Sequence, residues 1–301
     1  MNIILLHGSV ETSTDSPFLQ GLEQAGAVAA RVLSSSGSVL DAAEAGVRQM
    51  EDNPLFNAGY GSVPNRDGKV EMDASIMDGR TGRCGAVAAI AEVQHPVSVA
   101  RKVMEDTPHV VLAGQGALQF AREKGFPRFD PLSDTQYRNW KNAIAQREGS
   151  PRVYSLFTGV PKACDTVGCV VYSNGDLAAA SSTGGSFLKL PGRIGDTPII
   201  GGGIYASKEA AVVCTGLGEE FIRRHGASVV TDQIVQGVSV DRAAEHLIRA
   251  VSQSQVVGGV LVLDSKGNCA AAHNSDSFPV VLIIDGNRVA DFKPKFISRY
   301  M

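Results

Sequence analysis

The sequence has almost no excess of charge of either sign. Its 301 residues carry 28 Lys and Arg against 31 Asp and Glu, a formal net charge of -3 at pH 7. A protein that binds nucleic acid needs a basic surface to neutralise phosphates, and this balance provides none. Long hydrophobic runs are also missing, because none reaches the roughly 20 residues that span a bilayer. We therefore expect neither a nucleic-acid partner nor a membrane partner, although a chain with 44% hydrophobic residues can bury a large core.

Cysteines and histidines are few and scattered. The number of cysteines is odd and their spacing is not that of metal ligands, so we expect free thiols rather than a disulfide framework. The histidines form no ligand cluster, which argues against a catalytic transition metal. No basic leader precedes the apolar stretch 3–6, which we expect to be a strand, and a cytoplasmic location is the default. The cysteines are Cys84, Cys164, Cys169, Cys214 and Cys269.

The first half of the chain has patterns typical of helices that cover a sheet. Apolar residues recur with helical spacing over 22–51, in two successive helices. The apolar run 86–93 is typical of a strand, whereas 97–104 and 114–124 are typical of helices. From about 131 to 163 the sequence is polar and contains prolines without clean periodicity, which predicts an exposed linker.

The second half predicts a hairpin followed by further strands and helices. Two apolar runs flank Asn174-Gly175, a strong local signal for a hairpin turn. Strands with helices between them indicate helices packed on two stacked sheets, although periodicity alone does not distinguish this from other layered α/β folds. The further elements expected are strands at 211–214, 259–264, 269–274 and 280–284, and helices at 219–225 and 239–252.

The string Asp165-Thr166-Val167-Gly168 places a threonine where the first strand of that hairpin begins. A cut before Thr166 would give this residue a free amine beside its hydroxyl. An α-amino group, with an ordinary pKa of about 7.7–8.0, can accept the hydroxyl proton, so one residue would supply both nucleophile and base. The hairpin would carry Thr183, at the end of its second strand, back beside Thr166.

Downstream of the hairpin, two glycine-rich segments carry groups suited to a ligand. The loop 190–198 has Arg193 and Asp196 three residues apart. A guanidinium binds a planar carboxylate by two hydrogen bonds, and a carboxylate is the natural partner of an ammonium group. The glycines of 214–220 allow backbone N–H groups to approach a ligand closely, as an oxyanion hole requires. Together these segments suit the head group of an unmodified amino acid.

These features resemble the plant-type L-asparaginase and isoaspartyl peptidase family of N-terminal nucleophile hydrolases. Further matching motifs lie at 53–63, 71–79 and 258–259, so the resemblance covers most of the chain. It implies an α+β fold, a four-layer αββα sandwich, in one domain cleaved into an α subunit (1–165) and a β subunit (166–301). It also implies hydrolysis of L-asparagine and of β-aspartyl dipeptides, two small-molecule substrates that share one head group. The implied assembly is a homodimer of cleaved αβ units, a heterotetramer.

The resemblance assigns catalytic roles to residues at matching positions. Cleavage after Asp165 releases Thr166 as the nucleophile, and Thr183 hydrogen-bonds its side chain. Thr215 and Gly216 form the oxyanion pair, one with a hydroxyl and the other with a backbone N–H.

The resemblance also assigns the substrate-binding residues. Arg193 binds the substrate α-carboxylate and Asp196 binds its α-amino group. The backbone near Gly218 assists, together with the oxyanion pair.

The segment 50–60 resembles the family's sodium loop, in which backbone carbonyls surround a monovalent cation. Hard cations prefer oxygen ligands of this kind. The loop would hold Asn57 near the nucleophile. No other cofactor is expected. The implied carbonyl donors are Met50, Glu51, Asn53, Phe56, Ala58 and Tyr60.

One motif departs from the family. The family usually has His-Gly-Gly followed by a small residue and another glycine, whereas this chain has His7-Gly8-Ser9-Val10-Glu11. The lost glycines predict slow self-cleavage, since this loop lies near the scissile bond in the family. Alternatives to an asparaginase and β-aspartyl peptidase are a glycosylasparaginase, a taspase-like threonine endopeptidase, or an unprocessed relative without catalysis.

Overall fold

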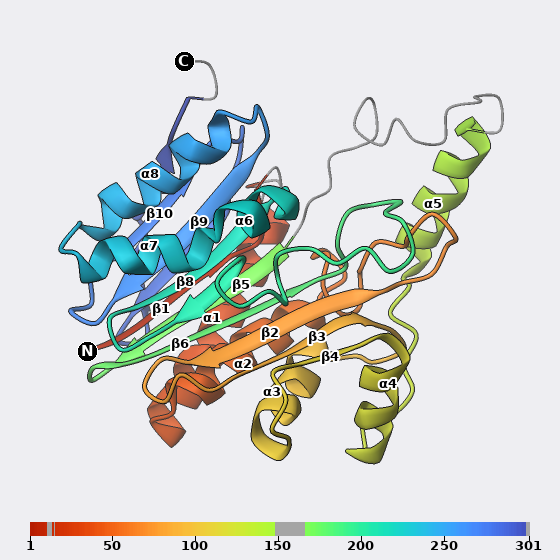
Figure 1. The fold of residues 1–301 in the computed structure, drawn as a ribbon, viewed down its shortest axis with the longest axis horizontal. Helices are drawn as coiled ribbons and strands as arrows, with labels where there is room; N and C mark the ends of the chain where they lie inside the picture. Colours follow the sequence, from red (N-terminus) through yellow and green to blue (C-terminus); the bar gives the residue numbers. More distant parts are fainter. Residues whose placement is uncertain (11–13, 15, 148–165, 299–301) are drawn as a thin grey trace.

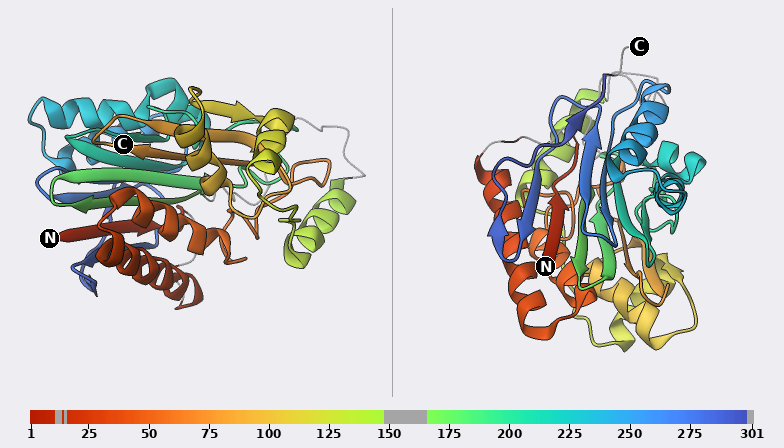
Figure 2. Two further views of the ribbon diagram at one scale, coloured as in Figure 1. Left: turned by 90° about the horizontal axis from the view of Figure 1, so that it is seen from below. Right: turned by 90° about the vertical axis from the view of Figure 1, so that its left-hand side faces the viewer.

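The computed structural model describes residues 1–10, 14, 16–147 and 166–298. Two β-sheets lie face to face, with helices on their outer sides (Figures 1 and 2). The larger sheet has the order β12 (Asn287–Arg288), β11 (Val280–Ile284), β1 (Asn2–His7), β5 (Thr166–Ser173), β6 (Asp176–Thr183), β2 (Met72–Asp78), β3 (Cys84–Ile90) and β4 (Val111–Ala113). The smaller sheet has the order β13 (Lys295–Phe296), β10 (Cys269–His273), β9 (Gly258–Asp264), β8 (Ala210–Gly216) and β7 (Ile204–Ala206).

Alternation of side chains along the strands builds three separate cores. In β1, Ile4 and Leu6 pack with the residues of the first two helices, whereas Ile3 and Leu5 point toward the smaller sheet. In β9 the same alternation turns Leu261 toward the larger sheet and its neighbours toward the helices of the other side. Successive apolar residues thus fill different layers. This arrangement confirms the four-layer αββα sandwich of the α+β class.

The helices form the two outer layers. The helix α8 buries one face at the spacing of successive turns, from Val240 through Ala244 and Leu247 to Val251, against β9 and β10. The side chain of Ser239 caps its first turn by accepting a hydrogen bond from the backbone of Arg242. The helices are α1 (Ser16–Ser36), α2 (Val39–Glu51), α3 (Pro96–Asp106), α4 (Gly114–Glu123), α5 (Asp134–Arg147), α6 (Gly218–Arg224), α7 (Gly226–Val235) and α8 (Val240–Ser252).

Two helices were not predicted from the sequence. The expected linker begins with α5, a polar helix without an apolar stripe, which Trp140 attaches to the body by donating a hydrogen bond to the carbonyl of Arg66 at 3.3 Å. The remainder of that linker, 148–163, lies outside the described residues. The helix α7 follows α6 after a single residue, His225, whose φ of 51° turns the chain between them.

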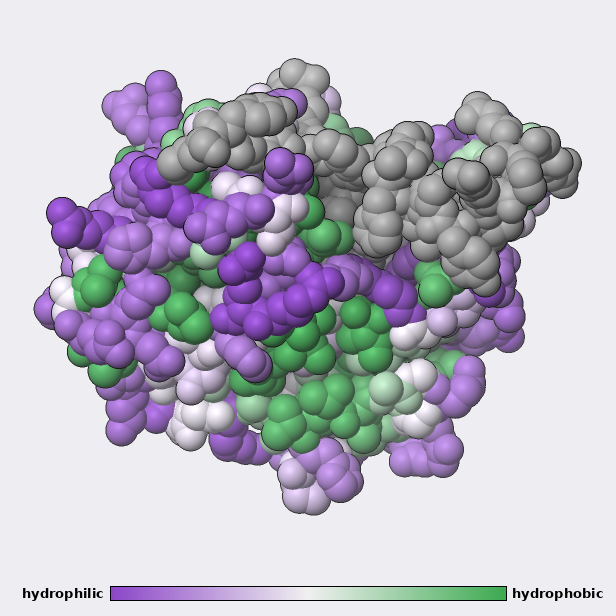
Figure 3. Space-filling view, turned by 45° about the horizontal axis from the view of Figure 1, so that its top comes forward, coloured by the Kyte–Doolittle hydropathy of each residue, from purple (hydrophilic) through white to green (hydrophobic). Residues whose placement is uncertain are grey.

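The face drawn in Figure 3 is largely hydrophilic where it is coloured. The largest group of hydrophobic residues on this face lies in the lower middle of Figure 3, and smaller groups lie elsewhere on the face. Exposed large hydrophobic side chains occur in both halves of the described chain, for example Val110, Val111 and Val235. No helix within the described ranges is long and apolar enough to cross a membrane. Four described cysteines, Cys84 among them, are free, whereas Cys164 lies outside the described residues.

Candidate active site

Thr166 is the first residue of β5, which lies between β1 and β6 in the larger sheet and packs against β8 of the smaller one. The hairpin turn after β5 uses Asn174 and Gly175 with φ of 51° and 93°, as a tight two-residue turn requires. The register then places Thr183 directly opposite Thr166, which confirms the position expected from the hairpin. Asp165 lies outside the described residues, so cleavage before Thr166 stays a prediction.

A small pocket lies beside Thr166. It joins the open ends of the hairpin, the loop that follows β6 and the end of β8. Ser186 is a polar lining residue that cannot be recognised from the sequence, because a serine in a glycine-rich loop carries no distinctive signal for a binding site. The lining residues are Thr166, Thr183, Gly185, Ser186, Arg193, Gly195, Asp196 and Gly216.

Arg193 has a partner that the sequence did not reveal. Its Nε and Nη2 donate hydrogen bonds to the two carboxylate oxygens of Glu219, each at 2.9 Å. Burial by itself would lower the pKa of Arg193, but the hydrogen bonds and charge of Glu219 raise it. For Glu219, burial acts to raise the pKa, and Arg193 more than offsets this and lowers it. The pair therefore stays ionised and holds the guanidinium in one orientation at the pocket.

Asp196 is a buried carboxyl group with an incomplete set of partners. Its Oδ2 has no hydrogen-bond partner among the described residues. Burial raises its pKa to about 7, although the charge of Arg193 opposes this shift. A Cβ added at Gly218 would lie 2.6 Å from Asp196 Oδ1. The close approach of the segment at Gly218 to the Asp196 side chain therefore depends on glycine. A cationic donor in the pocket would satisfy the free oxygen and favour ionisation.

Thr215 and Gly216 are the last two residues of β8, and Gly216 lines the pocket. Gly216 has a φ of 126°, and a Cβ there would lie 2.4 Å from the carbonyl oxygen of Val257. No other residue fits that position without a shift of the backbone. Thr215 is fully buried, and its Oγ1 lies 3.1 Å from the Oγ of Ser9. The smaller sheet therefore brings Gly216, one of the two expected oxyanion groups, to the pocket, and Thr215 precedes it in β8 without lining the pocket.

Asn57 connects the loop after α2 to the end of the hairpin. Its Nδ2 donates to the carbonyl of Gly185 at 2.7 Å, and its Oδ1 accepts from the backbone of Val63 at 2.8 Å. Its carbonyl accepts from the backbone of Gly184 at 2.9 Å. Thr183 is held in the same segment, since its Oγ1 accepts from the backbone of Gly185 at 2.9 Å. The loop thus fixes the strand end that faces Thr166.

Two buried charged residues near the pocket, Asp73 and Lys189, have no local signal in the sequence. Asp73 accepts hydrogen bonds from the backbone of Ala89 at 2.8 Å and of Gly195 at 3.1 Å. Lys189 donates to the carbonyl of Glu71 at 2.6 Å. Burial raises the pKa of Asp73 and lowers that of Lys189, and the charge of each partly offsets the shift of the other. These groups anchor the loop that carries Arg193, and no sequence spacing connects them.

His7 is the last residue of β1 and lies opposite Gly168 in the pairing of β1 with β5. It is completely buried, and burial lowers its pKa to about 3. Its ring is 5.6 Å from that of Phe278, centroid to centroid. A Cβ at Gly168 would lie 2.4 Å from His7 Nε2, so glycine makes room for the imidazole. His7 is therefore neutral at physiological pH.

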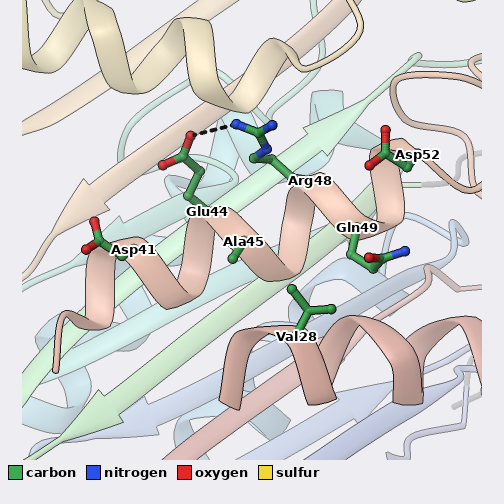
Figure 4. A pocket seen from close by; sticks show the side chains of 7 residues that line it. All are labelled: Val28, Asp41, Glu44, Ala45, Arg48, Gln49 and Asp52. Carbon is green, nitrogen blue, oxygen red and sulfur yellow. Dashed lines mark ion pairs between the residues drawn. The ribbon is translucent and has the colours of Figure 1, made fainter. Parts of the chain in front are cut away.

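A second hollow, between α1 and α2, is lined by Val28 and by side chains from α2 and its end (Figure 4). Its acidic groups already have partners from this chain. Glu44 contacts Arg48 at 3.9 Å, the ion pair drawn in the figure, and Arg101 at 2.7 Å. Asp52 lies 2.8 Å from His95. This hollow therefore lacks the unpaired groups that distinguish the pocket beside Thr166.

The αββα layers and the threonine at the start of a central strand are those of an N-terminal nucleophile hydrolase. Within that class, this chain belongs to the asparaginase family, whose sequence model matches residues 2–289. It is 40% identical to a plant-type L-asparaginase of Pyrococcus furiosus, over 95% of this chain and 97% of the relative. An isoaspartyl peptidase of Salmonella typhimurium is 39% identical, over 86% and 85% of the two chains. A human isoaspartyl peptidase/L-asparaginase is 38% identical, over 94% of each.

Proposed function

We propose that this protein cleaves itself between Asp165 and Thr166 and then hydrolyses L-asparagine to L-aspartate and ammonia, and β-aspartyl dipeptides to their two amino acids. The observation that carries this proposal is the pocket that joins Thr166 to Arg193 and Asp196. The printed names of the relatives, L-asparaginase and isoaspartyl peptidase, support the same pair of substrates.

In the proposed reaction, the hydroxyl oxygen of Thr166 attacks the side-chain carbonyl carbon of the substrate. The α-amine of Thr166 accepts the hydroxyl proton and then donates one to the leaving amine. The Thr215 hydroxyl and the Gly216 N–H stabilise the negative charge on the carbonyl oxygen. Water then attacks the resulting ester and restores the threonine. Thr183, opposite Thr166, holds the nucleophile through its side chain.

The substrate head group is bound by the charged side of the pocket. Glu219 occupies two of the five N–H groups of Arg193, which leaves others for an α-carboxylate. The Oδ2 of Asp196, which has no partner among the described residues, accepts from the α-ammonium group, and the backbone of Gly218 lies beside the other oxygen, Oδ1. A site of two buried charges favours a free amino acid head group over an internal residue of a polypeptide, as an endopeptidase would need. The pocket therefore favours an asparaginase over a taspase-like endopeptidase.

The loop 50–60 would hold a sodium ion through main-chain carbonyls. The loop closes on itself, because the backbone N–H of Tyr60 donates to the carbonyl of Glu51 at 2.7 Å and that of Asn53 donates to the carbonyl of Met50 at 3.1 Å. Each carbonyl retains a second lone pair, so the donor set suits a hard monovalent ion. No group of three or more His, Cys, Asp or Glu side chains in the described ranges is placed to hold a metal. The bound ion would supply only rigidity to the loop that carries Asn57.

The assembly and the location belong to the same proposal. The cleaved chains would pair as a homodimer of αβ units, an assembly that the family resemblance supports. The cytoplasm is the default location for this protein. Light scattering coupled to gel filtration tests the assembly, because a monomeric αβ unit would elute at the mass of one chain, 31.6 kDa.

The function is tested on the purified protein by intact mass, N-terminal sequencing and product analysis. The proposal expects a second N-terminus at Thr166, release of ammonia from L-asparagine and cleavage of β-Asp-Leu. Asparagine with an acetylated α-amine or an amidated α-carboxylate is the matched control and should be nearly inert. Efficient cleavage of an internal aspartyl peptide would instead support the endopeptidase, and an uncut, inactive chain would support the non-catalytic alternative.

A further inference from the structure

Ser9 has an unusual backbone conformation for a residue with a side chain. Its φ is 98°, whereas the other non-glycine residues with positive φ in the described chain have values between 47° and 60°. Those values lie in the left-handed helical region, which L-residues occasionally adopt, but 98° lies beyond it. Ser9 is also fully buried. Strain of this kind persists only where the surroundings hold it, and it is concentrated at functional sites.

The side chain of Ser9 contacts the proposed oxyanion site. Its Oγ lies 3.1 Å from Thr215 Oγ1, although the two residues are 206 positions apart. The same Oγ donates to the carbonyl of Val10, also at 3.1 Å. Ser9 comes just after β1 in the larger sheet, and Thr215 is on β8 in the smaller one. The two hydroxyls therefore form a buried polar bridge between the end of β1 and the end of β8, next to Gly216 of the pocket lining.

We propose that Ser9 is a positioning residue for the reaction, which directs the hydroxyl proton of Thr215 toward the substrate oxygen. This inference rests on the role of Thr215 proposed above. Each hydroxyl has one proton to donate. If Thr215 donates to Ser9, that proton is not available to the substrate. If Ser9 donates to Thr215 Oγ1 instead, the Thr215 proton is free.

The carbonyl of Val10 makes both arrangements accessible. Ser9 can donate to Val10 while it accepts from Thr215, or turn its proton to Thr215. As negative charge develops on the substrate oxygen, the order Ser9 to Thr215 to substrate is favoured, since successive hydrogen bonds polarise one another. Ser9 thus acts in the transition state through Thr215 and touches no reacting atom.

Two substitutions at Ser9 distinguish the effect of its hydroxyl on activity from the effect of its backbone strain. Ser9→Ala removes the hydroxyl but keeps a Cβ at the same φ. Ser9→Gly removes the hydroxyl and also relieves the backbone. If the hydroxyl acts as proposed, both variants lose kcat for L-asparagine by roughly three- to tenfold with little change in KM, less than the 10²–10³ typical of losing an oxyanion donor itself. If strain alone matters, Ser9→Ala keeps the wild-type kcat, and that result would overturn the proposal.

The test uses fully processed protein, with rates divided by the cleaved fraction from intact mass, so that slow maturation does not imitate slow turnover. A double-mutant cycle adds Thr215→Val and Thr215→Ser. The loss from Ser9→Ala should vanish in Thr215→Val and remain in Thr215→Ser. An equal loss in both backgrounds contradicts coupling through the Thr215 hydroxyl. Full activity of Thr215→Val would instead contradict the proposed oxyanion role, so the two failures are distinct. If Thr215→Val does not mature, the comparison of the two Ser9 variants still decides.

Discussion

The side of the site that we propose binds the substrate head group, the recognition side around Arg193 and Asp196, is built from charges. The side that we propose carries out the reaction, the reaction side around Thr166 and Gly216, is built from neutral groups. On the recognition side, Arg193 and Glu219 are paired and Asp196 is buried with a raised pKa. On the reaction side, Thr166 and Thr215 offer hydroxyls, with Gly216 providing backbone. Charges bind strongly but depend on pH, while hydroxyls and N–H groups depend on placement. We therefore expect substitutions on the two sides to affect different kinetic constants.

The largest effect is expected at Thr166. Thr166→Ala should abolish both self-cleavage and hydrolysis, because it removes the hydroxyl that performs both. Thr166→Ser should keep part of each, since a hydroxyl and, after cleavage, an amine remain. Denaturing electrophoresis after fixed incubation and an ammonia assay measure the two steps. Hydrolysis by the Ala variant at the wild-type rate would show that Thr166 is not the nucleophile.

A smaller effect is expected from Arg193→Lys. Lysine keeps the charge but loses the planar fork that pairs with Glu219 and with a substrate carboxylate, so kcat/KM should fall by an amount equivalent to about 2–3 kcal/mol. Most of the loss should be in KM. Glu219→Gln is the matched variant, because it removes the negative charge that pairs with the guanidinium and leaves Arg193 itself unchanged. A loss confined to kcat would show that recognition and reaction are not separate.

The pH dependence should distinguish the two sides as well. Burial raises the pKa of Asp196 to about 7, so the carboxylate that binds an ammonium group is lost as pH falls through 7. We expect KM for L-asparagine to rise as pH is lowered from 8 to 6. In Asp196→Asn, KM should be higher throughout and nearly independent of pH over that range. A KM that falls toward pH 6 in the wild type would have the wrong sign for this explanation.

Stability should show the opposite trend with pH. Burial raises the pKa of Glu51 from 4.5 to about 8. Because the folded pKa is the higher one, the native state binds the extra proton, and the stabilisation is present at low pH and lost as pH rises through about 8. Glu51→Gln should flatten the dependence of Tm on pH between 5 and 8, with Asp291→Asn, a substitution of an exposed carboxyl, as the control. An equally steep profile in the Gln variant would contradict the assignment.

The smallest effect is expected far from both sides, on α5. Trp140→Ala removes the hydrogen bond to Arg66 and the contact with Gly68, where a Cβ would lie 2.8 Å from the indole. We expect a loss of about 1 kcal/mol or less in unfolding free energy, because the site is half-buried and on a peripheral helix. The kcat and KM should not change. Asn139→Ala, an exposed neighbour, provides the control, and a change in kcat would connect α5 to the pocket.

What the sequence predicts well is set by short-range geometry. The position of Thr183 opposite Thr166 follows from one two-residue turn, and periodicity locates the helices α2, α3, α4, α6 and α8 within a few residues. The helix α1 begins at Ser16, before the expected start at residue 22. The partner of Arg193 was missed because Glu219 is brought to it by a loop and a change of sheet. The contact of Ser9 with Thr215 spans 206 positions and joins separate sheets, so no local pattern indicates it. The helix α5 was missed because its contact with the body depends on one tryptophan rather than on a periodic face.

The strand order of the larger sheet has a consequence for the mature molecule. The strand β1 precedes the proposed cut, yet it lies between β11 and β5, which both follow it, and β6 is paired with β2 from the first fragment. Two fragments interleaved in this way remain one body after the peptide bond is broken. Refolding of the uncut chain involves one polypeptide and is first-order in protein. Refolding of the mature protein requires two polypeptides to associate, so it is second-order. The apparent stability of the mature protein should therefore depend on its concentration.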